Sequence, residues 1–253
     1  MKNFIWPIKI IYLKEVDSTN KFAKLYIKQK LYSTILNEWI VIFSRKQFKG
    51  LGKKGFWLSE CNKNITFSII FNPKNILIKN IFLINIIISN AIHKILYAEI
   101  NYPIWIKWPN DIIIKNKKIG GILIENYIRS NTIKFSIIGI GINVKQKIFN
   151  EKWNATSLEK IFNVKFDIDY LIFKLVFFIQ KEYLIFLKFG TKIIKKYYID
   201  NLYMKNITNN FFYPKKKLFV FGTIQSITDK GFLLIEINNK LHSFWQEDII
   251  LTN

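Results

Sequence analysis

Two lysines, an amide and a carboxylate stand close together in an otherwise apolar part of the chain. Lys107, Asn110 and Asp111 belong to a Lys-Trp-Pro-Asn-Asp segment, and Lys118 follows after a short turn, just ahead of Gly120-Gly121. Unpaired charge in an apolar region is costly and therefore usually has a function. Glycines let a ligand approach the backbone, and a nearby lysine can neutralise a carboxylate or a phosphate. These residues indicate chemistry on anionic substrates.

A glycine- and lysine-rich segment offers a second place for phosphate. Residues 50–55 read Gly-Leu-Gly-Lys-Lys-Gly and match G-x-G-x-x-G, but a dinucleotide-binding fingerprint must open a helix and be followed about 20 residues later by an acidic residue. Here we expect a strand to follow, and Ile70 stands at that distance. Protein-kinase motifs are also absent from the sequence. The backbone N–H groups and the lysines of a loop over residues 44–63 can still close on a phosphate.

Three further segments carry polar groups or glycines at informative positions. Residues 17–20, Asp-Ser-Thr-Asn, can cap a helix or bind a polar ligand. Residues 139–143, Gly-Ile-Gly-Ile-Asn, and residues 155–158, Ala-Thr-Ser-Leu, are each weak signals alone. Their order along the chain makes the combination specific.

In this order the segments resemble the biotin protein ligases. That family has K-W-P-N-D, K-x-x-G-I-L-x-E, G-x-G-I-N and A-T-S-L elements, and a Q-x-x-G-[basic]-G-[basic]-[basic]-G stretch before a tryptophan. Gln47 and Trp57 fit the ends of that stretch, whereas Leu51 stands where the family usually has arginine. Lys53 is then the best candidate for charge contact with the acyl-phosphate.

The resemblance implies a set of site residues. It implies that Lys118 and Asp111 are catalytic, and it assigns no metal ligands. For biotin it implies contacts from Ser18, Thr19, Asn20, Gln47, Gly50, Leu51, Gly52, Lys53, Lys118, Gly121 and Gly139. For the nucleotide it implies contacts from Lys53, Lys54, Trp57, Lys107, Asn110 and Asn143.

The resemblance also implies the reaction. ATP and Mg²⁺ would activate biotin as biotinyl-5'-AMP, and a lysine of the biotin carboxyl carrier protein of acetyl-CoA carboxylase would accept the biotinyl group. A free lysine has a pKa of about 10.4, so only on the order of one in a few thousand is neutral at pH 7. We expect Asp111 to position or deprotonate that lysine.

The sequence pattern predicts an α+β fold. Strands that pair locally, with helices between groups of strands, favour a mixed sheet over a doubly wound one. By resemblance this is the catalytic domain of the biotin/lipoate ligase type at residues 1–205, followed by a small SH3-like β-barrel at residues 206–253. Helices are expected at residues 21–31, 78–99 and 169–201, the last with a break at Gly190. Strands are expected at residues 39–43, 65–71, 104–107, 112–115, 119–125, 133–144, 218–221, 223–227, 232–237, 241–245 and 249–251.

Composition limits the function classes. The formal charge of +22, from 39 basic and 17 acidic residues, would normally suggest nucleic acid or a membrane surface as a partner. Lysine is spread along the whole chain with Ile, Asn, Phe and Tyr, as an AT-rich coding sequence would produce, and arginine is almost absent. The most apolar window, residues 81–92, is shorter than the roughly 20 residues that span a bilayer. A lone Cys61 and the lack of a signal peptide indicate a cytoplasmic protein without a membrane partner.

Two alternatives stay open. A lipoate or octanoate ligase or transferase of the same fold usually shows an R-R-x-x-G-G-G-x-x-x-H-D stretch, which this sequence lacks. A basic nucleic-acid-binding protein would use the C-terminal barrel, where residues 215–217 are the only basic cluster beside a tyrosine. We expect no specific DNA binding, since too little sequence precedes the ligase segments for a helix-turn-helix domain, and a homodimer is left open.

Overall fold

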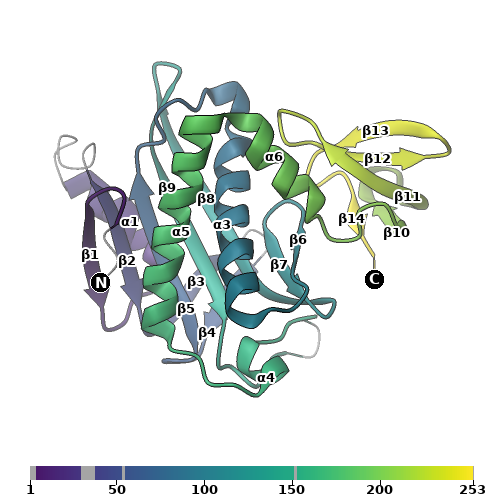
Figure 1. Cartoon of the computed structure of the whole chain (residues 1–253). Helices are drawn as coiled ribbons and strands as arrows, with labels where there is room; N and C mark the ends of the chain where they lie inside the picture. Colours follow the sequence, from purple (N-terminus) through teal and green to yellow (C-terminus); the bar gives the residue numbers. More distant parts are fainter. Residues whose placement is uncertain (1–3, 30–37, 53–54, 151–152, 253) are drawn as a thin grey trace.

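The computed structural model describes residues 4–29, 38–52, 55–150 and 153–252. In this part of the chain a mixed seven-stranded sheet has the order β1-β2-β5-β9-β8-β7-β6, with β1 and β2 parallel and the other pairs antiparallel. A five-stranded antiparallel sheet of order β13-β12-β11-β10-β14 follows it (Figure 1). The predicted α+β fold with a mixed sheet is confirmed.

The large sheet consists of β1 (Ile8–Leu13), β2 (Trp39–Ser44), β5 (Asn64–Phe71), β6 (Trp105–Lys107), β7 (Asp111–Ile114), β8 (Lys117–Arg129) and β9 (Thr132–Asn143). The helices are α1 (Thr19–Gln29), α3 (Phe82–Ile100), α4 (Leu158–Phe162), α5 (Ile168–Phe189) and α6 (Thr191–Asp200), with short 3-10 helices at Ile78–Asn80 and Pro214–Lys216. The small sheet consists of β10 (Thr208–Tyr213), β11 (Leu218–Ile227), β12 (Leu233–Ile237), β13 (Lys240–Phe244) and β14 (Ile250–Leu251).

Alternation along the strands separates two hydrophobic layers. On one face of the large sheet, Phe67 of β5 and Ile138 of β9 belong to the large core cluster formed with α3 and α5. On the other face, Ile70 and Phe135 pack with Ala23 of α1 in a smaller cluster. Figure 1 shows α3 and α5 side by side across the first face. Because side chains alternate along a strand, each strand contributes to both layers.

Helix α3 is the central element of the larger layer. Most of its residues are apolar and most are buried, as expected for a core helix rather than an amphipathic surface helix. Its length and hydropathy would suffice to cross a membrane, but 72% of the relevant window is buried inside the protein. Helix α5 begins at the N-cap Asp167, whose Oδ1 accepts from the backbone N–H of Asp169 and Tyr170, and the predicted break at Gly190 separates it from α6.

Tight turns with left-handed backbone join several strand pairs. Lys115 and Asn116 between β7 and β8 have φ of 48° and 60°, and Asn238 and Asn239 between β12 and β13 have φ of 50° and 57°. Two successive positive φ values are the mark of the turn that matches strand twist, and asparagine tolerates them well. The strands expected at residues 232–237 and 241–245 leave room for the turn at Asn238-Asn239, whereas the strand expected at residues 112–115 ends one residue later than β7 does.

The prediction of a long loop over residues 44–63 was wrong. This region contains the hairpin β3 (Gln47–Gly52) and β4 (Gly55–Ser59), in which Gly50 pairs with Trp57 and Leu51 with Phe56. Glycine and lysine are poor strand formers on average, so propensity gave no strand signal. Backbone pairing and the packing of Trp57 decide the structure here. No strand was predicted at β1 or at β10, and α4 was also missed.

The C-terminal strands form an open antiparallel sheet in the described part of the chain. The edge strands β13 and β14 are not paired with each other, so the expected barrel is not closed by strand pairing. The two predicted strands at residues 218–221 and 223–227 are one strand, β11. The expected domain boundary after residue 205 falls between the end of α6 and the start of β10 and stays a prediction.

Candidate functional site

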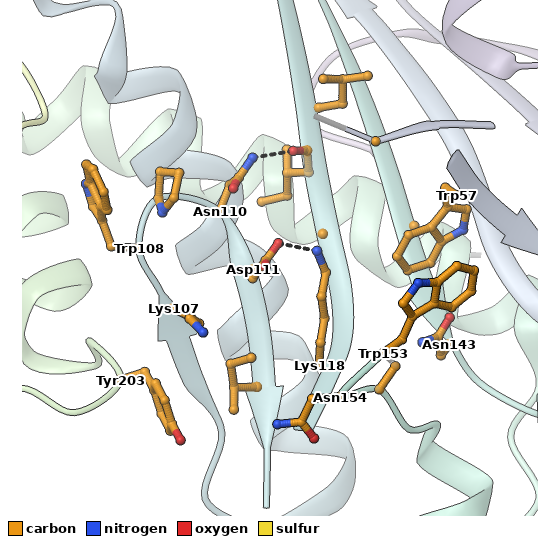
Figure 2. A pocket seen from close by; sticks show the side chains of 18 of the residues that line it. Trp57, Lys107, Trp108, Asn110, Asp111, Lys118, Asn143, Trp153, Asn154 and Tyr203 are labelled. Carbon is orange, nitrogen blue, oxygen red and sulfur yellow. Dashed lines mark hydrogen bonds and ion pairs between the residues drawn. The ribbon is translucent and has the colours of Figure 1, made fainter. Parts of the chain in front are cut away.

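A cavity of about 620 Å³ lies on the α1 side of the large sheet. Gly139 and Gly141 alternate with Ile138 and Ile140, which pack into the α3 and α5 layer, so the two glycines face the cavity. The predicted site residues that line it are Ser18, Thr19, Asn20, Gln47, Gly52, Trp57, Lys107, Asn110, Asp111, Lys118, Gly121, Gly139 and Asn143. Sequence positions more than a hundred residues apart therefore meet in one pocket (Figure 2).

Four predicted residues are not among those lining the pocket. Gly50 and Leu51 lie on β3, where Gly50 is packed so closely that a Cβ would come within 2.3 Å of Gln47 Nε2. Lys53 and Lys54 lie outside the described residues, so their predicted contacts with biotin and the nucleotide stay predictions.

One end of the pocket is a buried hydrogen-bond network at the start of α1. Gln47 Oε1 accepts from the backbone N–H of Thr19 at 2.9 Å. Ser68 Oγ on β5 lies 2.8 Å from Thr19 Oγ1 and 2.6 Å from Asn20 Oδ1. Thr19, Asn20, Gln47 and Ser68 are all buried. The network leaves donor and acceptor sites over, and these favour a ligand that can pair with them, because a buried group left unpaired costs about 1 to 3 kcal/mol.

The glycine at residue 139 is needed by this polar end. A Cβ at this position would lie 2.4 Å from Asn20 Oδ1, which is shorter than any normal contact. The Asn20 amide therefore rests directly on the Gly139 backbone. This explains one glycine of the Gly-Ile-Gly-Ile-Asn segment by close approach of a side chain.

A cationic centre lies beside the polar end. Lys118 Nζ is 2.6 Å from Asp111 Oδ1, across the paired strands β7 and β8 (Figure 2). A Cβ at Gly121 would come within 3.2 Å of both atoms, so the glycine leaves room for the pair. Asp111 is the only carboxylate among the described residues lining the pocket.

Lys107 adds a second cation. Its Cα is paired with that of Asp111 in the β6–β7 register, and it has no hydrogen-bond or ion-pair partner among the described residues. Burial lowers the pKa of Lys107; the Asp111 carboxylate acts against this shift and the charge of Lys118 adds to it. A half-buried lysine with no ion-pair partner among the described residues attracts an anionic group.

The Lys-Trp-Pro-Asn-Asp segment is held from several sides. Trp108 Nε1 donates to Gly231 O at 3.0 Å, which joins the β6–β7 turn to the C-terminal sheet. Tyr198 Oη and Asn85 Nδ2 both donate to Pro109 O, at 2.7 and 2.8 Å. Asn110 Nδ2 donates to Ile122 O, and Ile122 N donates back to Asn110 O at 3.2 Å. The segment thus has a structural role in addition to the chemical one expected of it.

The hairpin β3–β4 covers the far side of the pocket. Trp57 lies on Gly141, where a Cβ would come within 2.5 Å of the indole ring. The Trp57 Nε1–H is buried and has no hydrogen-bond partner in the part of the chain that the structure describes. The second glycine of the Gly-Ile-Gly-Ile-Asn segment therefore makes room for the ring of Trp57, which is labelled among the pocket side chains in Figure 2.

The Ala-Thr-Ser-Leu segment runs beside Lys118. Lys118 N donates to Asn154 O at 2.8 Å, and Thr156 N donates to Lys118 O at 2.9 Å. Asn143 Nδ2 donates to Thr156 O at 3.0 Å. These bonds fix the backbone of the lysine, so that only its side chain is left to move.

Several residues that line the pocket could not be identified from the sequence. Trp108 lies in the Lys-Trp-Pro-Asn-Asp segment, and Trp153 lies two residues before the Ala-Thr-Ser-Leu segment. An aromatic side chain in or beside a motif was the available signal. A further set of lining residues comes from the C-terminal part of the chain: Tyr203, Phe211, Ile224, Leu233, Gln246, Ile249, Ile250 and Leu251. No local pattern marks these residues, because only the docking of the two sheets brings them to the pocket.

No group of three or more His, Cys, Asp or Glu side chains that could hold a metal is found among the described residues. Asp111 is the carboxylate that the described residues contribute to the pocket. Mg²⁺ is usually held by one or two carboxylates together with substrate phosphates, so this donor set fits a metal that arrives with a nucleotide.

Comparison with known proteins agrees with this site. The model of the biotin/lipoate A/B protein ligase family matches residues 12–143, more than half of the chain. The bifunctional ligase/repressor BirA of Bacillus spizizenii is 28% identical over 256 residues, which cover 99% of this chain and 76% of that protein. BirA of Escherichia coli is 25% identical over 150 residues, which cover 56% of this chain and 44% of that protein.

Two solved structures have the same fold. The biotin protein ligase from Aquifex aeolicus in complex with biotin and ATP has a TM-score of 0.78 and 25% identity, covering 96% of this chain and 98% of that chain. The Leishmania major enzyme in complex with biotinyl-5-AMP has a TM-score of 0.63 at 18% identity, covering 94% and 98%. With the family model matching from β1 to the end of β9, the chain belongs to the biotin/lipoate A/B protein ligase family.

Proposed function

We propose that this protein is a biotin protein ligase, which activates biotin with ATP as biotinyl-5'-AMP and transfers the biotinyl group to a lysine of a biotin carboxyl carrier protein. The observation that carries the proposal is the pocket itself. A buried polar end made by Thr19, Asn20 and Gln47 continues into a cationic centre made by Lys118 and Lys107. The relatives named biotin protein ligase and BirA support the same activity.

The polar end favours biotin over lipoate. Biotin carries a cyclic urea with N–H donors and a carbonyl acceptor, whereas the dithiolane ring of lipoate has no such groups. A lipoyl ring would leave the second acceptor site of Asn20 Oδ1 and the Gln47 Nε2–H without a ligand partner, at a cost of about 1 to 3 kcal/mol for each group. A site built to hydrogen-bond its substrate rejects an analogue without those groups strongly.

The cationic centre addresses the first chemical difficulty. A carboxylate and the α-phosphate of ATP repel each other and must come within bonding distance. Lys118 and Lys107 lie where they can neutralise both groups, and the charges are fixed before the substrates bind. The carboxylate oxygen then attacks the α-phosphorus, and pyrophosphate leaves.

We propose Mg²⁺ as a partner of the ATP phosphates. Bound there, it would neutralise charge on the triphosphate, and Asp111 is the carboxylate that could reach it. Asp111 is also our candidate for orienting the acceptor lysine. The hairpin β3–β4 and the segment that contains Trp153 would shield the acyl-adenylate from water.

We propose a cytoplasmic location and a carrier of the acetyl-CoA carboxylase type. The single cysteine, Cys61, is exposed and unpaired, which suits a reducing compartment.

The proposal is tested by ATP-dependent labelling of a purified carrier domain. We expect labelling with biotin, dependent on ATP and Mg²⁺, and none with lipoate. A carrier in which the acceptor lysine is replaced by arginine is the control. Labelling with lipoate in place of biotin would contradict the proposed substrate.

A further inference from the structure

Glu125 contacts the polar end of the pocket from outside it. Its Oε2 accepts from Asn20 Nδ2 at 3.0 Å, and its Oε1 pairs with Lys24 Nζ at 2.6 Å, although Glu125 does not line the pocket. Asn20 and Lys24 are four residues apart on α1 and therefore lie on the same side of the helix. One carboxylate thus holds the first turns of α1 against β8.

The carboxylate fixes the direction of the Asn20 amide. An ionised carboxylate only accepts hydrogen bonds, so it selects the NH₂ group of Asn20 and turns Oδ1 away from itself. Oδ1 then lies over Gly139 and 2.6 Å from Ser68 Oγ, whose single hydrogen it can accept. An amide oxygen has two acceptor sites, and Ser68 uses one of them. The other is left for a ligand in the pocket.

The amide of Gln47 presents a donor to the pocket, whereas the amide of Asn20 presents an acceptor. Gln47 Oε1 accepts the backbone N–H of Thr19, so its Nε2 is the atom left to donate. The pocket end therefore offers an acceptor from Asn20 and a donor from Gln47. A cyclic urea presents the complementary pair, a ring N–H and a carbonyl oxygen.

We propose that Glu125, with Lys24 as its counter-ion, is a positioning residue that keeps Asn20 as a hydrogen-bond acceptor for a ring N–H of biotin. The inference rests on the proposed function and adds a residue that does not touch the substrate. Without Glu125 only the longer contact of Asn20 Nδ2 with Leu123 O, at 3.5 Å, still selects the NH₂ group, so the amide can turn over and direct that group at the ligand N–H. Two donors then face each other, and biotin binds more weakly.

The first test compares biotin binding and kinetics in single variants. Glu125→Ala raises the Kd and KM for biotin about tenfold, the effect of losing one well-placed hydrogen bond, while kcat stays within about twofold. Glu125→Gln keeps an acceptor for Asn20 and recovers the Kd to within about threefold of the wild type. The matched control is Glu99→Ala, which breaks a similar ion pair with Lys174 and leaves the biotin Kd unchanged.

The second test exchanges the two groups. Asn20→Asp places two carboxylates next to each other and weakens biotin binding. In Asn20→Asp/Glu125→Gln the new amide at position 125 can donate to the new carboxylate at position 20, which again shows an oxygen to the pocket. The double variant binds biotin more tightly than Asn20→Asp alone. Additive losses would overturn the positioning role.

Binding of biotin without ATP separates this inference from the ligase activity. If the wild type binds biotin and Glu125→Ala binds it equally well, Glu125 has no positioning role, whatever the protein catalyses. If the wild type binds no biotin, the proposed function and this inference both fail.

Discussion

Lys118 and Asp111 form an ion pair of 2.6 Å between neighbouring strands of the pocket wall. The pair holds the lysine ammonium and the carboxylate over Gly121, where a larger residue would crowd both groups. An anionic substrate must share the ammonium with Asp111, and an incoming amine must share the carboxylate with Lys118. Two half-reactions can therefore use the same pair in different ways.

Replacement of the lysine tests the first half-reaction. We predict that Lys118→Ala lowers biotin-dependent adenylate formation by at least about a hundredfold, the usual effect of removing a group that stabilises developing charge. Exchange of labelled pyrophosphate into ATP measures this step. Lys115→Ala is the control, since Lys115 lies in the adjacent turn, is exposed and does not line the pocket. Exchange near the wild-type rate in Lys118→Ala would contradict the role of Lys118.

Replacement of the carboxylate tests the second half-reaction. We predict that Asp111→Ala reduces transfer of the biotinyl group to the carrier more than it reduces adenylate formation, because the acceptor amine loses the group that positions or deprotonates it. Single-turnover transfer from preformed biotinyl-adenylate, compared with pyrophosphate exchange, measures the two steps separately. Equal losses in both half-reactions would remove Asp111 from this role.

The contact of Trp57 with Gly141 gives a prediction about the hairpin. A methyl group at Gly141 would lie 2.5 Å from the indole ring, so Gly141→Ala must displace Trp57 and with it the β3–β4 hairpin. We predict that Gly141→Ala raises the KM for ATP about tenfold or more, as expected when a contacting ring is moved. In Trp57→Ala/Gly141→Ala the glycine change has little further effect, because no ring is left to clash. Full additivity of the two losses would show that the clash is not the cause.

His93 gives a prediction about stability at acid pH. His93 Nε2 lies 2.9 Å from Ile104 O, a pure acceptor, so this nitrogen carries the proton and Nδ1 accepts from Tyr197 Oη at 2.8 Å. Burial lowers the pKa of His93 below its ordinary value of 6.5. Between the two pKa values the unfolded chain binds a proton that the folded chain does not. The free energy of unfolding therefore falls as the pH drops through about 6.5 towards the lowered pKa.

Urea unfolding at pH 7.5 and 5.5 measures this effect. We predict that His93→Gln loses less stability than the wild type between these two pH values, since the substituted side chain does not titrate. His242→Gln is the control, because His242 is exposed on β13. An equal pH response in His93→Gln and the wild type would contradict the role of His93.

The sequence predicted those parts of the fold that depend on local pattern. The apolar helix α3, the break at Gly190 and the central strands follow from periodicity and from glycine. The hairpin β3–β4 could not be predicted in this way, because its glycines and lysines have low strand propensity and Trp57 packs on a residue more than eighty positions away.

The site was predictable where segments carry ordered motifs, and not where only tertiary packing supplies a residue. The structure places Lys118, Asp111 and Asn20 at the pocket, as expected from their motifs. The link from Glu125 to Asn20 needs the position of α1 on the sheet. The wall made by Phe211, Ile224 and other residues of the small sheet needs the docking of that sheet against the K-W-P-N-D turn, where Trp108 bonds to Gly231.

The central claim is that one pocket brings the carboxylate of biotin and the α-phosphate of ATP together. Exchange of labelled pyrophosphate into ATP, measured with the purified protein and Mg²⁺, tests it most directly. We predict exchange that requires biotin and is not supported by lipoate. No exchange in the presence of biotin, with a protein that is folded, would contradict the account.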